Sequence, residues 1–188
     1  MMRMVQFSVF VNGAIIMILE LVATRVLAPY AGTTMEVWSA VIGVMLAAVG
    51  VGYSLGGVLA DKRRSLATLA LFFALAGCSV VFIVFMDGVL LPAITRNVFY
   101  GLDAFLGAVT TYTIRLGVRG VDSLGETNGM LYALSTLGSL LGVFGTSLYL
   151  VPTYHVSTIL YGVSGGLLLM ATFCFGLYAF SPRIKRNP

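Results

Sequence analysis

The chain has 188 residues, of which 59% are hydrophobic and only 10% are charged, and its mean hydropathy is +1.01. Soluble globular proteins carry charge at roughly a quarter of their positions, so this composition excludes a sizeable soluble domain and predicts a protein embedded in a lipid bilayer. The net charge of +4 comes from basic residues gathered in one set of loops, which membrane orientation alone produces, so nucleic acid is not an expected partner.

Apolar runs separated by charged residues predict an all-α integral membrane protein with six transmembrane helices, at about 5–28, 37–60, 66–86, 97–116, 128–151 and 156–180. Residues 127–182 contain no Asp, Glu, Lys or Arg over 56 positions. At about 1.5 Å per residue this stretch crosses a hydrocarbon core of roughly 30 Å twice, with a turn around Pro152. Residues 88–95 are open to three interpretations: a loop, a re-entrant segment or an early helical turn. We expect residues 1–182 to form a single transmembrane bundle.

The first predicted helix carries two charged residues within its apolar run, Glu20 and Arg25. Five positions separate them, so they do not form the favoured i, i+4 pair, and we expect Arg25 to reach toward the outer headgroups and Glu36. Glu20 then needs a partner on another helix. Because ionisable groups are costly inside a bilayer, both residues are candidates for function.

Glycines recur on the second and fifth predicted helices at spacings that place them on one helix face. A glycine face lets another backbone approach closely, so we expect these two helices to be central in the bundle. Their matching positions in two three-helix halves predict a 3+3 inverted repeat, although ordinary tight packing explains the glycines equally well. The residues concerned are Gly43, Gly50 and Gly57, the GxxxG pair Gly52 and Gly56, and Gly138, Gly142 and Gly145.

The loop after the second helix has the sequence GGVLADKRR at positions 56–64. It resembles the cytoplasmic loop of the major facilitator superfamily, in which glycines, an aspartate and basic residues join the second and third helices. The resemblance implies a gating role for Gly57, Asp61, Arg63 and Arg64. The alternative is that these residues only bind neighbouring helix ends and lipid phosphates.

Two further segments make the resemblance more specific, ELVATR at 20–25 and GMLYALSTLG at 129–138. With the loop, they resemble the membrane domain of spermidine-synthase-like proteins, the fused facilitator/spermidine synthases, over almost the whole chain. The resemblance implies a bundle like half of a facilitator transporter and a link to polyamine metabolism. In that family a soluble aminopropyltransferase-like domain follows the bundle, whereas here only residues 182–188 follow Ser181. We therefore expect the chain to lack that activity.

Asp103 on the fourth helix falls at a depth similar to that of Glu20. Tyr100 lies one turn from Asp103, and Tyr112 lies further along the same helix. Two carboxylates at one level predict a buried site for an amine, another small cation or a proton, with Glu20, Arg25, Asp103, Tyr100 and Tyr112 as candidate residues. The alternative is a structural network in which Arg25 and Arg96 neutralise the acids.

Arg115 and Arg119 lie four residues apart on one helix face, which predicts a cytoplasmic docking strip for a soluble partner, or ordinary anchoring of the helix end. Cys78 and Cys174 lie in apolar runs without metal-ligand spacing, and no nucleophile, base or metal constellation is visible. We therefore expect no metal, no cofactor and no enzymatic activity.

A cytoplasmic N-terminus would place nine of the eleven basic residues on the inner side, including those of the tail at 183–188. We therefore expect an integral protein of the cell membrane with both termini in the cytoplasm. Two functions remain. The first is a noncatalytic anchor or regulatory subunit for a separate, aminopropyltransferase-like soluble protein. The alternative is a transporter of a small solute, a polyamine or another cation, that works as a homodimer of six-helix bundles.

Overall fold

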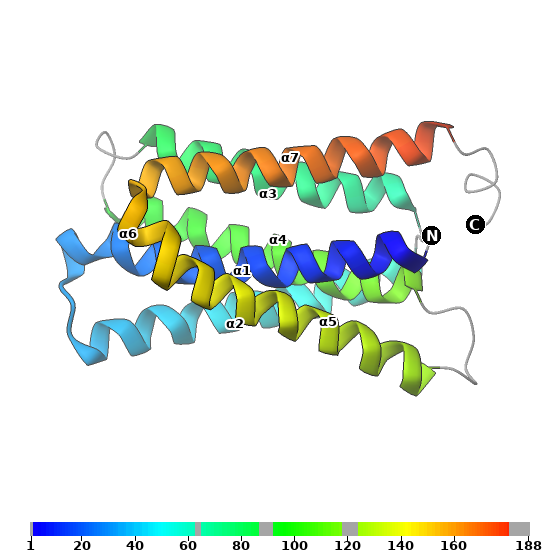
Figure 1. Cartoon of the computed structure of the whole chain (residues 1–188), viewed down its shortest axis with the longest axis horizontal. Coiled ribbons are helices and arrows are strands. Elements are labelled where there is room, and N and C mark those ends of the chain that lie inside the picture. Colours follow the sequence, from blue (N-terminus) through cyan, green and yellow to red (C-terminus); the bar gives the residue numbers. More distant parts are fainter. Residues whose placement is uncertain (1, 63–64, 87–91, 118–123, 181–188) are drawn as a thin grey trace.

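The computed structural model describes residues 2–62, 65–86, 92–117 and 124–180, and no strand occurs within these ranges. Its long helices run side by side along one axis (Figure 1). The expected all-α architecture is confirmed for this part of the chain. The elements are α1 (Met2–Ala31), α2 (Met35–Lys62), α3 (Leu66–Met86), α4 (Pro92–Gly117), α5 (Leu124–Gly145), the π-helical segment η1 (Thr146–Leu150), α6 (Val151–Thr153) and α7 (Val156–Phe180).

Five helical stretches are long and apolar enough, by length and composition, to cross a membrane. They are Met2–Pro29, Met35–Lys62, Leu66–Phe85, Gly125–Thr153 and Val156–Phe180. Large hydrophobic side chains are exposed along these helices, as expected for a surface that faces hydrocarbon. The protein is therefore a helical membrane protein. The helix α4 is not among the five stretches, so the count of six crossings stays a prediction.

The fourth helix begins earlier than its predicted start at residue 97. It begins at Pro92, so residues 92–95 form its first turn, and residues 87–91 lie outside the described part of the chain. Proline suits the first position of a helix, because its missing N–H would have no partner there and its φ angle is already helical.

The fifth helix is not one continuous α-helix to residue 151. It changes to a π-helix at Thr146–Leu150, and the Val151 N–H then bonds to the Thr146 carbonyl. Pro152 explains this change, because proline has no N–H and its ring clashes with the carbonyl four residues earlier in an α-helix. The chain becomes extended at Tyr154, which makes the predicted turn before α7.

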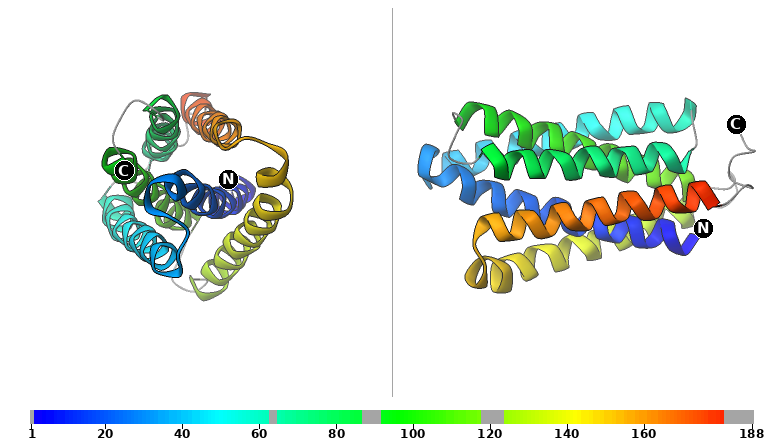
Figure 2. Two further views of the ribbon diagram at one scale, coloured as in Figure 1. Left: turned by 90° about the vertical axis from the view of Figure 1, so that its left-hand side faces the viewer. Right: turned by 90° about the horizontal axis from the view of Figure 1, so that it is seen from above.

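Three pairs of helices pack most closely: α2 with α4, α3 with α7, and α1 with α5. The helices α1 and α4 also contact each other and so occupy the centre of the bundle, as the end view in Figure 2 shows for α1. The prediction that the second and fifth helices are central is therefore wrong. Buried polar residues such as Asn12 of α1 and Asp103 of α4 have to avoid lipid, which places these two helices inside.

In two of the three pairs, glycines bring one helix backbone directly against the other. A Cβ atom at Gly52 or Gly56 of α2 would collide with the backbone of α4. One at Gly138 or Gly142 of α5 would collide with the backbone of α1 in the same way. The predicted contact roles of the GxxxG pair and of these two α5 glycines are confirmed.

The glycines at seven-residue spacing on α2 do not pack as predicted. A Cβ atom at Gly43 or Gly50 would have no atom within 4 Å, and one at Gly57 would make only an ordinary contact. The same open space surrounds Gly145 of α5. The contact face of α2 is set instead by its buried residues Val41, Met45, Val49, Gly52, Gly56 and Ala60, which lie on a different side of the helix from Gly43 and Gly50.

The start of α1 and the end of α7 lie at the same end of the bundle (Figure 1), which is called the Met2 end below. The described basic residues Arg3, Lys62 and Arg115 belong to helix ends on this side, whereas Arg25 lies toward the other end. This charge distribution favours a cytoplasmic Met2 end, and the cytoplasmic location itself stays a prediction.

Labelling of single cysteines is expected to show this orientation as an all-or-none difference. In a background without Cys78 and Cys174, a Thr33→Cys variant should react with a membrane-impermeant maleimide in intact cells. A Gly125→Cys variant, at the Met2 end and in open space, should react only after the cells are permeabilised. Reaction of both variants, or of the Gly125→Cys variant alone, in intact cells would contradict the orientation.

Candidate functional site

The contact between α1 and α4 is antiparallel, and its register is set by two described contacts. Near the Met2 end, Gly117 faces Val5. Further along, the Asn12 side-chain amide donates hydrogen bonds to the Leu106 carbonyl at 3.0 Å and to the Thr110 hydroxyl at 2.7 Å. Continuing this register at 1.5 Å per residue brings Glu20 of α1 to the level of Asp103 of α4.

The two acids lie near the middle of the bundle and interact electrostatically. Asp103 is 0% exposed, and neither of its carboxyl oxygens has a hydrogen-bond partner among the described residues. Glu20 is half-buried, and its Oε1 atom likewise lacks a partner. The structure therefore brings Glu20 and Asp103 together as an acid pair within the membrane-spanning part of the fold.

No described cation neutralises this acid pair. Arg25 is exposed and makes no ion pair with Glu20 or with Glu36 within the described residues. The side chain of Arg96 lies outside the described part of the chain. A buried carboxylate without a cation or a hydrogen-bond donor is costly, so the pair has to be neutralised by a proton or by a bound cation.

Of the two tyrosines predicted to join the acids, only Tyr112 has a described side chain. The side chain of Tyr100 lies outside the described residues. Tyr112 is fully buried nearer the Met2 end, where its hydroxyl accepts a hydrogen bond from the Ser65 N–H at 2.8 Å and donates one to the Ser65 carbonyl at 3.2 Å. Tyr112 thus connects α4 to the start of α3 instead of lining the acid pair.

A different tyrosine lies close to the acids. Tyr53 of α2 interacts electrostatically with Glu20 and with Tyr132 of α5, and both tyrosines are partly exposed. Sequence reasoning did not find them, because a tyrosine within an apolar run is usually a packing residue. The only feature of the sequence that set Tyr53 apart was its position between the glycines of α2.

The predicted gating loop and docking strip share one ion pair. The Arg115 Nε atom lies 2.6 Å from the Asp61 carboxylate and so joins the Met2 ends of α4 and α2. Arg63, Arg64 and Arg119 lie outside the described residues. The Arg115 and Asp61 side chains are exposed, at 38% and 63%, so this ion pair contributes little to stability.

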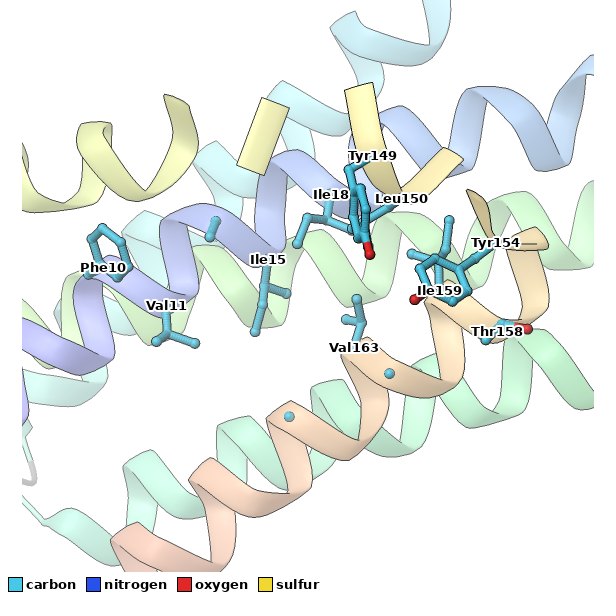
Figure 3. A pocket seen from close by; sticks show the side chains of 13 residues that line it. Phe10, Val11, Ile15, Ile18, Tyr149, Leu150, Tyr154, Thr158, Ile159 and Val163 are labelled. Atoms are coloured by element: carbon cyan, nitrogen blue, oxygen red, sulfur yellow. The ribbon is translucent and has the colours of Figure 1, made fainter. Parts of the chain in front are cut away.

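A separate apolar groove of about 560 Å³ opens between α1, η1 and α7. Figure 3 shows Ile15 and Ile18 of α1 facing Val163 of α7 across it, with Tyr149 and Tyr154 at the η1 end. Neither Glu20 nor Asp103 lines this groove. The groove is apolar and is not part of the acid site.

Comparison of the chain with protein-family models, with curated proteins and with solved structures finds no match. Among the described residues there is also no group of three or more His, Cys, Asp or Glu side chains that could hold a metal ion. The chemistry of the site therefore has to be argued from the acid pair itself.

Proposed function

We propose that this chain is the membrane unit of a transporter for a small cation, which binds between α1 and α4 at Glu20 and Asp103. The observation that carries the proposal is Asp103, which is fully buried with both carboxyl oxygens unpartnered among the described residues. A purely structural carboxylate would have a cation or hydrogen-bond donors beside it. A site for an exchangeable cation explains why Asp103 has none among the described residues.

The helix contacts in the two three-helix halves of the bundle support a transporter. The glycines Gly52 and Gly56 of α2 meet Ala104 and Ala108 of α4. In the same way, Gly138 and Gly142 of α5 meet Phe10 and Ala14 of α1. The α2–α4 pair and the α5–α1 pair therefore make matching contacts, although one pair runs in the opposite direction to the other. This correspondence favours a 3+3 inverted repeat.

Two more glycines fit the same pattern. Gly107 of α4 faces Val49 of α2, and Gly13 of α1 faces Ser135 of α5. Under such a repeat α1 and α4 are equivalent, and the acid pair lies at the interface of the two repeats near mid-depth. Secondary transporters commonly bind their substrates and coupling ions at this position.

The resemblance to spermidine-synthase-like membrane domains makes spermidine the first amine to test. A homodimer is part of the proposal, because Glu20 is only half-buried and a carboxylate at membrane depth has to be shielded from lipid. A second bundle placed over this face would supply that shield. The anchor role for a soluble aminopropyltransferase-like protein stays a prediction.

Spermidine is expected to raise the melting temperature of the purified protein in lipid nanodiscs. A cation present at 100 times its Kd adds about 2.7 kcal/mol to the free energy of unfolding. Asp103→Asn should abolish the spermidine-dependent shift and leave the melting temperature without spermidine unchanged or raised, because it removes a carboxyl group that is costly to bury. Sodium chloride at equal ionic strength controls for screening.

Asp61→Asn is the matched control, because Asp61 is an exposed acid with its own cation. This variant should keep the full spermidine-dependent shift. The proposal for an amine would be contradicted if spermidine left the parent protein unchanged. A site of any kind would be contradicted if Glu20→Gln and Asp103→Asn both lowered the melting temperature and no tested cation or pH change shifted the parent.

A further inference from the structure

A second polar cluster lies in the α1–α4 contact, between the acid pair and the Met2 end. It consists of Ser8 and Asn12 of α1 and Thr113 of α4, and all three are 0% exposed. Ser8 lies one turn before Asn12, and Thr113 lies one turn after Thr110, to which Asn12 is bonded. In the antiparallel register, Ser8 and Thr113 are therefore both one turn nearer the Met2 end than this bond. We call the three residues the inner polar cluster.

Each member of the inner polar cluster has a buried polar atom without a partner among the described residues: Ser8 Oγ, Asn12 Oδ1 and Thr113 Oγ1. The orientation of Asn12 is fixed, because only its Nδ2 atom can donate to the Leu106 carbonyl. Its Oδ1 atom therefore needs a separate donor. Thr113 also differs from Thr110, whose hydroxyl bonds to the Leu106 carbonyl within its own helix.

We infer that water binds inside the bundle at Ser8, Asn12 and Thr113 and bridges α1 to α4. The cluster presents one carbonyl acceptor and two hydroxyls, and it holds no charged group. Water suits this set, because one molecule can donate to Asn12 Oδ1 while it accepts from or donates to the hydroxyls.

Apolar residues flank the cluster on both sides along the α1–α4 contact. Val5 meets Gly117 on the side of the Met2 end, and Leu106, which is 0% exposed, lies on the side of the acid pair. The inference does not depend on the proposed cation site, because it would hold even if Glu20 and Asp103 bound only protons.

The sign of the stability change in single variants tests the inference. If water is bound, Thr113→Val and Ser8→Ala each remove a hydrogen-bond partner and should lower the melting temperature of the full chain in nanodiscs. If the cluster is dry, each substitution removes an unsatisfied hydroxyl from an apolar surrounding and should raise it. Ser164→Ala is the control, because the Ser164 hydroxyl is equally buried and donates to the Gly77 carbonyl at 3.2 Å.

Combining Ser8→Ala with Thr113→Val makes the test specific for a shared water. When both hydroxyls bind the same water, the double variant should lose less than the sum of the two single losses in melting temperature. Ser8→Ala combined with Ser164→Ala should instead be additive. An increase in melting temperature for either Ser8→Ala or Thr113→Val, or an additive Ser8→Ala/Thr113→Val variant, would overturn the inference. Because Glu20 and Asp103 stay in place, these results are independent of the spermidine test.

Discussion

Gly52→Leu is expected to push α2 away from α4 and to lower the free energy of unfolding by about 1–3 kcal/mol. Even a Cβ atom at this position would collide with the backbone of Ala104 and Ala108, and backbone atoms cannot move aside as a flexible side chain can. Leucine adds three further carbons to that collision. Reversible unfolding in mixed micelles, followed by circular dichroism, would measure the loss.

Gly50→Leu is the matched control, two residues away on the same helix. A Cβ atom at Gly50 has no atom within 4 Å, so leucine there should face lipid and leave the free energy of unfolding nearly unchanged. Equal stabilities of the Gly52→Leu and Gly50→Leu variants would show that the close contact between α2 and α4 does not form in the folded protein.

Phe73→Ala is expected to have the largest effect on stability, a loss of roughly 3–5 kcal/mol. Phe73 lies in α3, is 0% exposed and belongs to the main hydrophobic core. Removing a buried ring leaves a cavity that closely packed helices fill only in part, so contacts are lost on every side of it. The same unfolding measurement applies.

Phe85→Ala separates this packing effect from the simple loss of an aromatic ring. Phe85 lies on the same helix but is 72% exposed, so its truncation creates no cavity. It should change the free energy of unfolding by less than about 0.5 kcal/mol, the usual range for exposed positions. A Phe73→Ala variant as stable as Phe85→Ala would contradict the described core.

Helix positions could be predicted well wherever charge or proline marks a boundary. The predicted helices at 66–86 and 156–180 agree with α3 and α7. The π-helical segment η1 could not be predicted, because it depends on how the chain relieves the clash made by Pro152. The central helices were predicted wrongly, because seven-residue glycine spacing identifies a helix face but does not show whether a neighbour covers it.

For the site, counting residues from the helix ends predicted a similar depth for Glu20 and Asp103, and the structure brings the two acids close enough to interact electrostatically. Sequence could not decide whether Arg25 neutralises them, because a long side chain can turn either inward or toward the surface. The inner polar cluster was missed for another reason. Ser8, Asn12 and Thr113 are small polar residues within apolar runs, and only their burial without partners makes them noticeable.

The glycine contacts also determine which helix contacts resist displacement of one helix against another and which allow it. In the α1–α5 and α2–α4 pairs, backbone lies against backbone, so there are no rotamers between the helices that could absorb a displacement. The α1–α4 contact is different, because it includes a longer side chain, Asn12, which bonds to the Leu106 carbonyl and to the Thr110 hydroxyl. Any sliding of one helix pair against the other is therefore concentrated along this seam. Gain or loss of charge at Glu20 or Asp103 acts on this contact and not on the two contacts in which backbone lies against backbone.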